Sequence, residues 1–126
     1  MSGAIERWHE VVRAGDPAAL DALLAEDAVF FSPVVHTPQR GKAVTKAYLA
    51  AALKVLGHAD FRYVEQWVGP SSAALEFRTV LQGVEVEGID IISWNADGRI
   101  DRFKVMIRPL KAIEAVRARM AAALMV

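Results

Sequence analysis

The segment spanning residues 84–108 (VEVEGIDIISWNADGRIDRFKVMIR) restricts the possible folds of this chain more than any other stretch. Two long runs of alternating side chains flank the tetrapeptide NADG at residues 95–98. Gly98 can adopt the positive φ that a tight hairpin turn needs, and the side chains of Asn95 and Asp97 can bond their own backbone. The segment therefore predicts two long β-strands joined by a hairpin turn.

One carboxylate interrupts the apolar face of this predicted hairpin. After the turn, the residues on that face are Phe103, Val105 and Ile107. Before the turn, Asp90 shares a face with Val86, Ile92 and Trp94. An alternation with a period of two is typical of strands with one buried face. Because a buried carboxylate without partners is costly, Asp90 is the first candidate for a functional residue.

Composition excludes several classes of protein. The 126 residues are 54% hydrophobic, enough for a substantial core, and we expect a single domain over residues 1–126. The formal net charge is zero and the basic residues are not clustered, so no nucleic-acid partner is expected. Without cysteine, the chain has no disulfides and no thiol catalysis. Residues 1–10 lack a signal-peptide pattern and no apolar run would span a bilayer, so we expect a cytoplasmic protein without membrane contact.

The order of helical and strand patterns predicts an α+β fold. Apolar residues at helical spacing and terminal signals indicate four helices, at residues 2–14, 17–25, 42–56 and 110–125. Asp16 followed by Pro17 is a strong start signal for the second helix. Further strands are expected at residues 29–34, 60–68 and 73–82. Helices that precede a run of antiparallel strands indicate helices packed on one face of a curved sheet.

Three segments resemble the nuclear-transport-factor-2-like superfamily, and in particular its SnoaL-like and ketosteroid-isomerase-like branch. They are residues 8–31 (WHEVVRAGDPAALDALLAEDAVFF), 41–49 (GKAVTKAYL) and 88–100 (GIDIISWNADGRI). The resemblance covers nearly the whole chain and implies a single SnoaL-like domain. The superfamily includes isomerases, cyclases, dehydratases, epoxide hydrolases and non-catalytic domains, so the fold alone does not indicate the reaction.

The resemblance implies a cone-shaped, strongly curved antiparallel sheet of about four to six strands. Three N-terminal helices would close a cavity inside the cone, and a C-terminal helix would follow. Combined with the strand alternation, this predicts a mostly apolar cavity suited to a small hydrophobic ligand. The expected lining residues are Trp8, Val12, Ser32, Tyr48, Leu75, Phe77, Thr79, Ile92, Trp94, Phe103, Val105 and Ile107. The outer sheet face is partly apolar, and the resemblance implies a homodimer that covers it.

Catalytic positions of ketosteroid isomerases can be compared with this chain one at a time. The resemblance places Asp90 where those enzymes carry a protonated aspartate that donates to the substrate oxygen. It places Ser32 at the position of the general base, and a serine without an activating partner cannot remove a proton from carbon. It places Trp8 at the position of a tyrosine, and an indole only donates a hydrogen bond. We therefore expect ketosteroid isomerase activity to be absent.

His36 is the second candidate catalytic residue. It lies in a predicted loop near the cavity mouth, and its pKa range suits proton transfer near neutrality. A pair of His36 and Asp90 would support acid/base chemistry, whereas an exposed loop histidine would have no role. Asp90 also has a structural alternative, as a buried acid satisfied by an aromatic side chain or the backbone. The three histidines lack metal-ligand spacing, so neither a metal nor another cofactor is expected.

Two classes of function fit these observations. The first is a cofactor-independent acid/base isomerase, cyclase or lyase that acts on a small hydrophobic carbonyl or hydroxyl compound. In it, Asp90 would be the acid, and His36 or a bound water would accept the proton. The second is a non-catalytic dimeric module that binds a ligand or a partner. The position of His36 relative to the cavity distinguishes the two.

Overall fold

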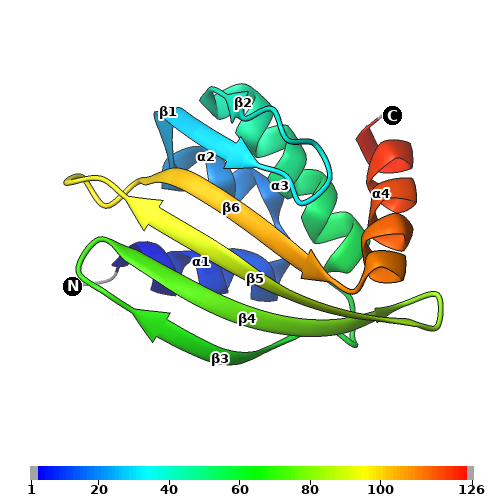
Figure 1. Ribbon diagram of the computed structural model, residues 1–126. Helices are drawn as coiled ribbons and strands as arrows, with labels where there is room; N and C mark the ends of the chain where they lie inside the picture. Colours follow the sequence, from blue (N-terminus) through cyan, green and yellow to red (C-terminus); the bar gives the residue numbers. More distant parts are fainter. Residues whose placement is uncertain (1–2, 125–126) are drawn as a thin grey trace.

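The computed structural model describes residues 3–124, and its elements follow the predicted α+β order (Figure 1). The predicted helix ends at Ser2 and Met125 lie outside the described residues. None of the described helices is both long and apolar enough to cross a membrane. The elements are α1 (Gly3–Ala14), a 3₁₀ turn η1 (Pro17–Ala19), α2 (Leu20–Leu23), β1 (Leu24–Phe31), β2 (Gln39–Arg40), α3 (Lys42–Leu56), β3 (Arg62–Val68), β4 (Ser72–Leu81), β5 (Val84–Trp94), β6 (Ile100–Arg108) and α4 (Leu110–Leu124).

Six strands form one curved sheet in the order β2-β1-β6-β5-β4-β3. Figure 1 shows this sheet bending around α1, α3 and α4. The expectation of a wholly antiparallel sheet is wrong at one position, because β1 runs parallel to β6, with Phe30 opposite Phe103. These two strands are far apart in the chain and are not joined by a turn, so no local signal sets their relative direction.

The predicted hairpin is confirmed as the pair β5 and β6, which places Asp90 opposite Val105. Gly98 has a φ of 75°, as the turn requires. The Asn95 side chain accepts hydrogen bonds from the backbone N–H groups of Asp97 and Arg99 at 3.0 and 3.1 Å. The turn therefore fixes the register that puts Asp90 on the inner face of the sheet.

The second helix is shorter than its pattern predicts. Asp16 caps it as expected, with Oδ1 accepting from the N–H of Ala18 at 3.0 Å. The chain then forms only a 3₁₀ turn and one turn of α-helix, and β1 begins at Leu24 instead of near residue 29. Leu24 is fully buried and pairs with Ile100, so strand pairing prevails over the local helical propensity of this Ala- and Leu-rich segment.

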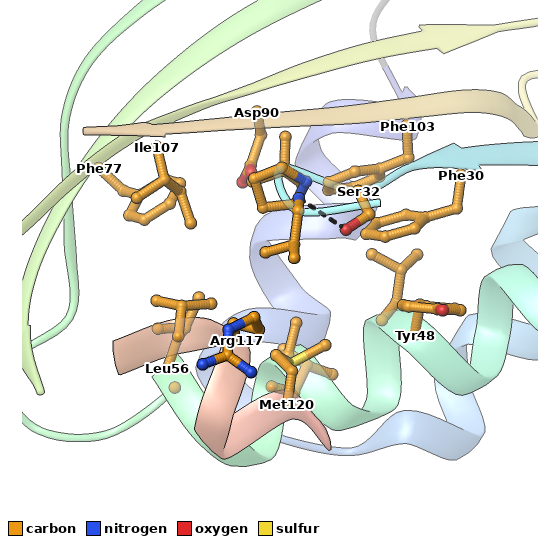
Figure 2. A pocket seen from close by; sticks show the side chains of 18 of the residues that line it. Phe30, Ser32, Tyr48, Leu56, Phe77, Asp90, Phe103, Ile107, Arg117 and Met120 are labelled. Carbon is orange, nitrogen blue, oxygen red and sulfur yellow. Dashed lines mark hydrogen bonds between the residues drawn. The ribbon is translucent and has the colours of Figure 1, made fainter. Parts of the chain in front are cut away.

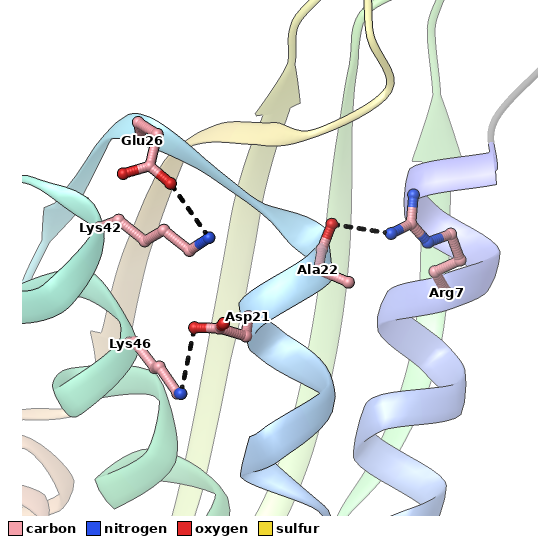
Figure 3. Close-up of polar contacts among 6 residues, drawn as sticks. All are labelled: Arg7, Asp21, Ala22, Glu26, Lys42 and Lys46. Carbon is pink, nitrogen blue, oxygen red and sulfur yellow. Dashed lines mark hydrogen bonds and ion pairs between the residues drawn. The ribbon is translucent and has the colours of Figure 1, made fainter.

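Polar contacts fix the short α2 between its neighbours (Figure 3). The Arg7 guanidinium donates to the carbonyl of Ala22 at 3.0 Å, which connects α1 to α2. Lys46 of α3 pairs with Asp21 of α2 at 3.2 Å. Lys42 of α3 pairs with Glu26 at the start of β1 at 3.3 Å. Exposed pairs of this kind contribute little free energy each, so the apolar core provides most of the stability.

Gly88 allows one aromatic ring to lie flat against the inner face of the sheet. It stands on β5 opposite Phe77 of β4 and Ile107 of β6. A Cβ at this position would overlap the Phe77 ring and would come within 2.9 Å of the Met106 carbonyl oxygen. Phe77 is 1% exposed and its ring packs against Phe61 and Tyr63 at centroid distances of 5.2 and 6.4 Å, so a shift of the ring would cost these contacts. The absence of a side chain at residue 88 therefore determines where Phe77 packs.

We expect Gly88→Ala to lower the free energy of unfolding by about 1–3 kcal/mol, because overpacking a filled core forces side chains and backbone to shift. Urea unfolding followed by circular dichroism measures this change. Gly3→Ala is the matched control, since a Cβ at Gly3 has no atom within 4 Å and should leave the stability nearly unchanged. Equal stability of Gly88→Ala and the wild type would show that Phe77 can move freely.

Candidate functional site

A mostly apolar cavity of about 270 Å³ lies between the inner face of the sheet and helices α1, α3 and α4 (Figure 2). Asp90 enters it from the sheet, whereas Arg117 and Met120 enter it from α4 on the opposite side. Several predicted lining residues do line it, namely Trp8, Val12, Ser32, Tyr48, Phe77, Phe103, Val105 and Ile107. The strand alternation therefore identified the correct face of the sheet.

Four predicted lining residues lie outside this cavity. Leu75, Ile92 and Trp94 belong to the core packed against α1 and the start of β1. Thr79 is also buried, and its hydroxyl has no hydrogen-bond partner among the described residues. Alternation identifies the side of a strand on which a residue lies, but not how far along the strand the cavity extends.

Helix α4 forms part of the cavity wall, and α2 does not. The lining residues from α4 are Val116, Arg117, Met120, Ala121 and Leu124, and none of the lining residues comes from α2. This corrects the expectation that three N-terminal helices close the cavity. The helical spacing of Val116, Met120 and Leu124 shows an apolar stripe, but it does not show what that stripe covers.

A chain of hydrogen bonds ends on Asp90. The Tyr63 hydroxyl donates to Asp90 Oδ2 at 2.6 Å, and Trp8 Nε1 donates to the Tyr63 oxygen at 2.9 Å. Asp90 is 6% exposed, and hydrogen bonds among residues 3–124 reach only its Oδ2 atom. Its other oxygen, Oδ1, is therefore available to a molecule in the cavity.

Burial raises the pKa values of both Asp90 and Tyr63. It raises the pKa of Asp90 from 3.8 to about 7, although the hydrogen bond from Tyr63 acts in the opposite direction. Burial, together with the nearby Asp90 charge, raises the pKa of Tyr63 well above its ordinary value. Asp90 therefore changes its protonation state near neutral pH, while Tyr63 keeps its proton and remains a hydrogen-bond donor.

Tyr63 is a site residue that the sequence patterns do not identify. The pairing of β3 with β4 shifts between Tyr63 and Glu65, so alternation along β3 does not predict its inner face. The ring of Tyr63 is held by edge-to-face contacts with His9, Phe61 and Phe77, at centroid distances of 5.3, 5.1 and 6.4 Å.

The structure does not bring His36 and Asp90 together. His36 is exposed and is not among the residues that line the cavity. The Ser32 hydroxyl does face the cavity, but it accepts hydrogen bonds from the backbone N–H groups of Val34 and Val35 at 3.0 and 3.2 Å (Figure 2). Neither side chain is therefore positioned as a base next to Asp90.

Other polar groups add little to the site. The Tyr48 ring lines the cavity and stacks on Phe30 at a centroid distance of 5.0 Å. Within the part of the chain that the structure describes, no three histidine or carboxylate side chains gather as a metal site would require. The chemistry that the described cavity can perform therefore centres on Asp90.

The stability of the protein should depend on pH through Asp90. Between pH 4 and pH 7 the unfolded chain loses this proton, whereas the folded chain keeps it, so the free energy of unfolding falls as pH rises. A pKa increase from 3.8 to about 7 corresponds to roughly 4 kcal/mol over that interval. Asp90→Asn removes this dependence. Its free energy of unfolding should therefore rise by roughly 4 kcal/mol relative to that of the wild type as pH increases from 4 to 8.

Urea unfolding at one-unit pH steps measures the effect. Asp97→Asn, which changes an exposed aspartate in the β5–β6 turn, is the matched control and should follow the wild-type curve. Parallel curves for Asp90→Asn and the wild type would mean that Asp90 is ionised in the folded protein throughout this pH range.

Comparison with known proteins is consistent with this architecture. A steroid Δ-isomerase of Nocardioides simplex is 30% identical over 113 residues, which cover 86% of this chain and 90% of that protein. A crystal structure of a steroid Δ-isomerase from Pseudomonas aeruginosa is 35% identical, with a TM-score of 0.92, and the match covers 97% of this chain and 89% of the other.

A second solved structure is similar to the same extent. It is an uncharacterized bacterial protein with a cystatin-like fold from Silicibacter pomeroyi that is 34% identical, with a TM-score of 0.91, and the match covers 100% of this chain and 88% of the other. The SnoaL-like domain family matches residues 5–103, from α1 to the middle of β6. The chain therefore belongs to the SnoaL-like family.

Proposed function

We propose that the cavity binds a small hydrophobic carbonyl compound and that Asp90 donates a proton or a hydrogen bond to the carbonyl oxygen. The observation that carries this proposal is a buried carboxyl group whose free oxygen faces an apolar cavity. A reaction of this kind needs no cofactor, and it matches the isomerase, cyclase and lyase chemistry expected from the sequence.

The environment of Asp90 suits this role. Because burial raises the pKa of Asp90 to about 7, the protonated form is present at neutral pH. A general acid is most effective when its pKa lies near the working pH. Tyr63 holds Oδ2 in place, so the proton on Oδ1 points to the ligand and not to the hydrogen-bond chain. With His36 exposed, water is the proposed acceptor of the proton that leaves carbon.

The relatives named steroid Δ-isomerase suggest a ring ketone as the ligand. Moving a ring double bond requires a base that takes a proton from one carbon and returns it to another. Ser32 provides no such base, so we continue to expect no ketosteroid isomerase activity. The cavity volume of about 270 Å³ lies just below the roughly 300–1,000 Å³ typical of small-molecule sites, which favours a small ligand.

Proton exchange at carbon tests this proposal without knowledge of the natural substrate. 2-Acetylnaphthalene is a rigid apolar ketone, and exchange of its methyl protons in deuterated buffer reports enolisation. We expect the wild type to accelerate the exchange, and the acceleration to fall as pH rises through about 7, because only protonated Asp90 donates. Asp90→Asn should bind the ketone but lose about a hundredfold or more of the exchange rate.

Two controls make the result decisive. Asp97→Asn should exchange at the wild-type rate, because Asp97 lies in the exposed turn. Binding of the ketone without accelerated exchange would contradict catalysis and support the ligand-binding module. Isomerisation of a β,γ-unsaturated steroid ketone would contradict the expected absence of ketosteroid isomerase activity and would show that an effective base acts in the cavity.

A non-catalytic dimeric module is the second candidate. The exposed position of His36 favours it, because the expected base does not line the cavity, and the outer face of the sheet favours its dimeric part. Trp67 and Met106 are 55% and 50% exposed there, beside the half-buried Ile89 and Ile91. The pairing of Trp67 with Ala74, and of Ala74 with Ile91, places these side chains on the same face. An apolar face of this kind usually needs cover, and a second copy of the sheet would provide it.

Sedimentation equilibrium tests the proposed dimer. We expect the wild type to sediment as a dimer and Met106→Lys to shift toward the monomer, because burying a lysine in the interface requires removing its charge from water. Val80→Lys is the control, since Val80 is also exposed but lies farther along β4, away from the apolar group. A monomeric wild type at high micromolar concentration would contradict the proposal.

A further inference from the structure

Arg117 is the single basic residue in the cavity wall, counted over the described residues. It lies on α4, on the opposite side of the cavity from Asp90 (Figure 2). Within residues 3–124, no carboxylate approaches its guanidinium to within 4.0 Å, and it donates no side-chain hydrogen bond to another residue. Among the described residues, no carboxylate neutralises the charge of Arg117.

The surroundings of Arg117 are apolar. Met120, Ala121 and Leu124 follow it along α4, and Val34 and Val35 also border the cavity. Val34, Val35 and Leu124 are exposed by 38%, 43% and 38%, so they form an apolar rim that is open to solvent. Arg117 itself is exposed, so water and salt weaken its attraction for an anion, but none of these apolar neighbours competes for its hydrogen-bond donors.

The cavity therefore has two distinct polar ends joined by apolar walls. One end offers the Oδ1 atom of Asp90, which suits a carbonyl or hydroxyl oxygen. The other end offers a guanidinium, whose planar set of donors matches a carboxylate with two parallel hydrogen bonds. A ligand that satisfies both ends has an uncharged oxygen at one end and an anionic group at the other.

We propose that the ligand of this cavity is a small hydrophobic keto acid whose carboxylate binds Arg117 while its carbonyl oxygen faces Asp90. This inference rests on the proposed function, because it assumes that Asp90 marks the end of the cavity that holds the carbonyl group. It adds the chemical class of the ligand and the orientation of the bound ligand in the cavity. Arg117 is a binding and specificity residue in this proposal, and not a proton-transfer group.

A matched series of ligands tests the assignment. 6-Acetyl-2-naphthoic acid carries a ketone and a carboxylate at opposite ends of a rigid apolar body, its methyl ester removes the charge, and 2-acetylnaphthalene lacks the group altogether. We expect the wild type to bind the acid roughly tenfold more tightly than the ester, as one charge-assisted pair would provide. Arg117→Gln should abolish this preference, whereas Arg117→Lys should keep part of it.

Arg119→Gln is the control on the same helix. Arg119 faces a different hollow, beside His58 and Asp60, so its loss should leave the preference for the acid unchanged. Titrations by fluorescence at two salt concentrations add a second readout, because the preference of the wild type should weaken as salt rises.

The possible outcomes separate this inference from the proposed function. If the neutral ketone and the ester bind but the acid binds no more tightly, the role of Arg117 is overturned and the proposed function remains. If Arg117→Gln keeps the preference for the acid, the carboxylate binds elsewhere and the inference is again overturned. If none of the three compounds binds, the proposed function itself fails.

Discussion

The hydrogen bond from Tyr63 to Asp90 joins parts of the molecule that the chain keeps far apart. Tyr63 stands on the edge strand β3, Asp90 stands on the central strand β5, and Trp8 of α1 donates to the same hydroxyl. Without these donors Asp90 would be a buried carboxyl group exposed only to apolar neighbours. The three residues therefore satisfy a costly polar group and fix α1 against the sheet at the same time.

The cavity exists because the elements around it are held apart by their own packing. Gly88 lets Phe77 lie flat on the sheet, and the aromatic ring in turn supports Tyr63. On the other side, α3 and α4 share a core in which Leu56 and Val116 pack together. The wall facing Asp90 is thus made of α3 and α4. The space between these two helices and the sheet is the cavity available to a ligand.

Sequence patterns predicted some of these features well, for identifiable physical reasons. The bounds of α3, the β5–β6 hairpin and the inward position of Asp90 follow from local periodicity and turn chemistry. The parallel pairing of β1 with β6, the length of α2 and the contact of Tyr63 with Asp90 depend on distant residues, which no local pattern contains. The cavity wall supplied by α4, with Arg117, was missed because an amphipathic stripe does not specify its partner.

The division of the cavity between sheet and helix has an evolutionary consequence. The acidic group and its donors lie on α1, β3 and β5, whereas the wall opposite them comes from α3 and α4. Substitutions along α4 can therefore alter the size and charge of the acceptable ligand without disturbing the groups that hold Asp90. A helix that shapes the ligand space without holding the acid gives a lineage a way to change substrates while its proton chemistry stays constant.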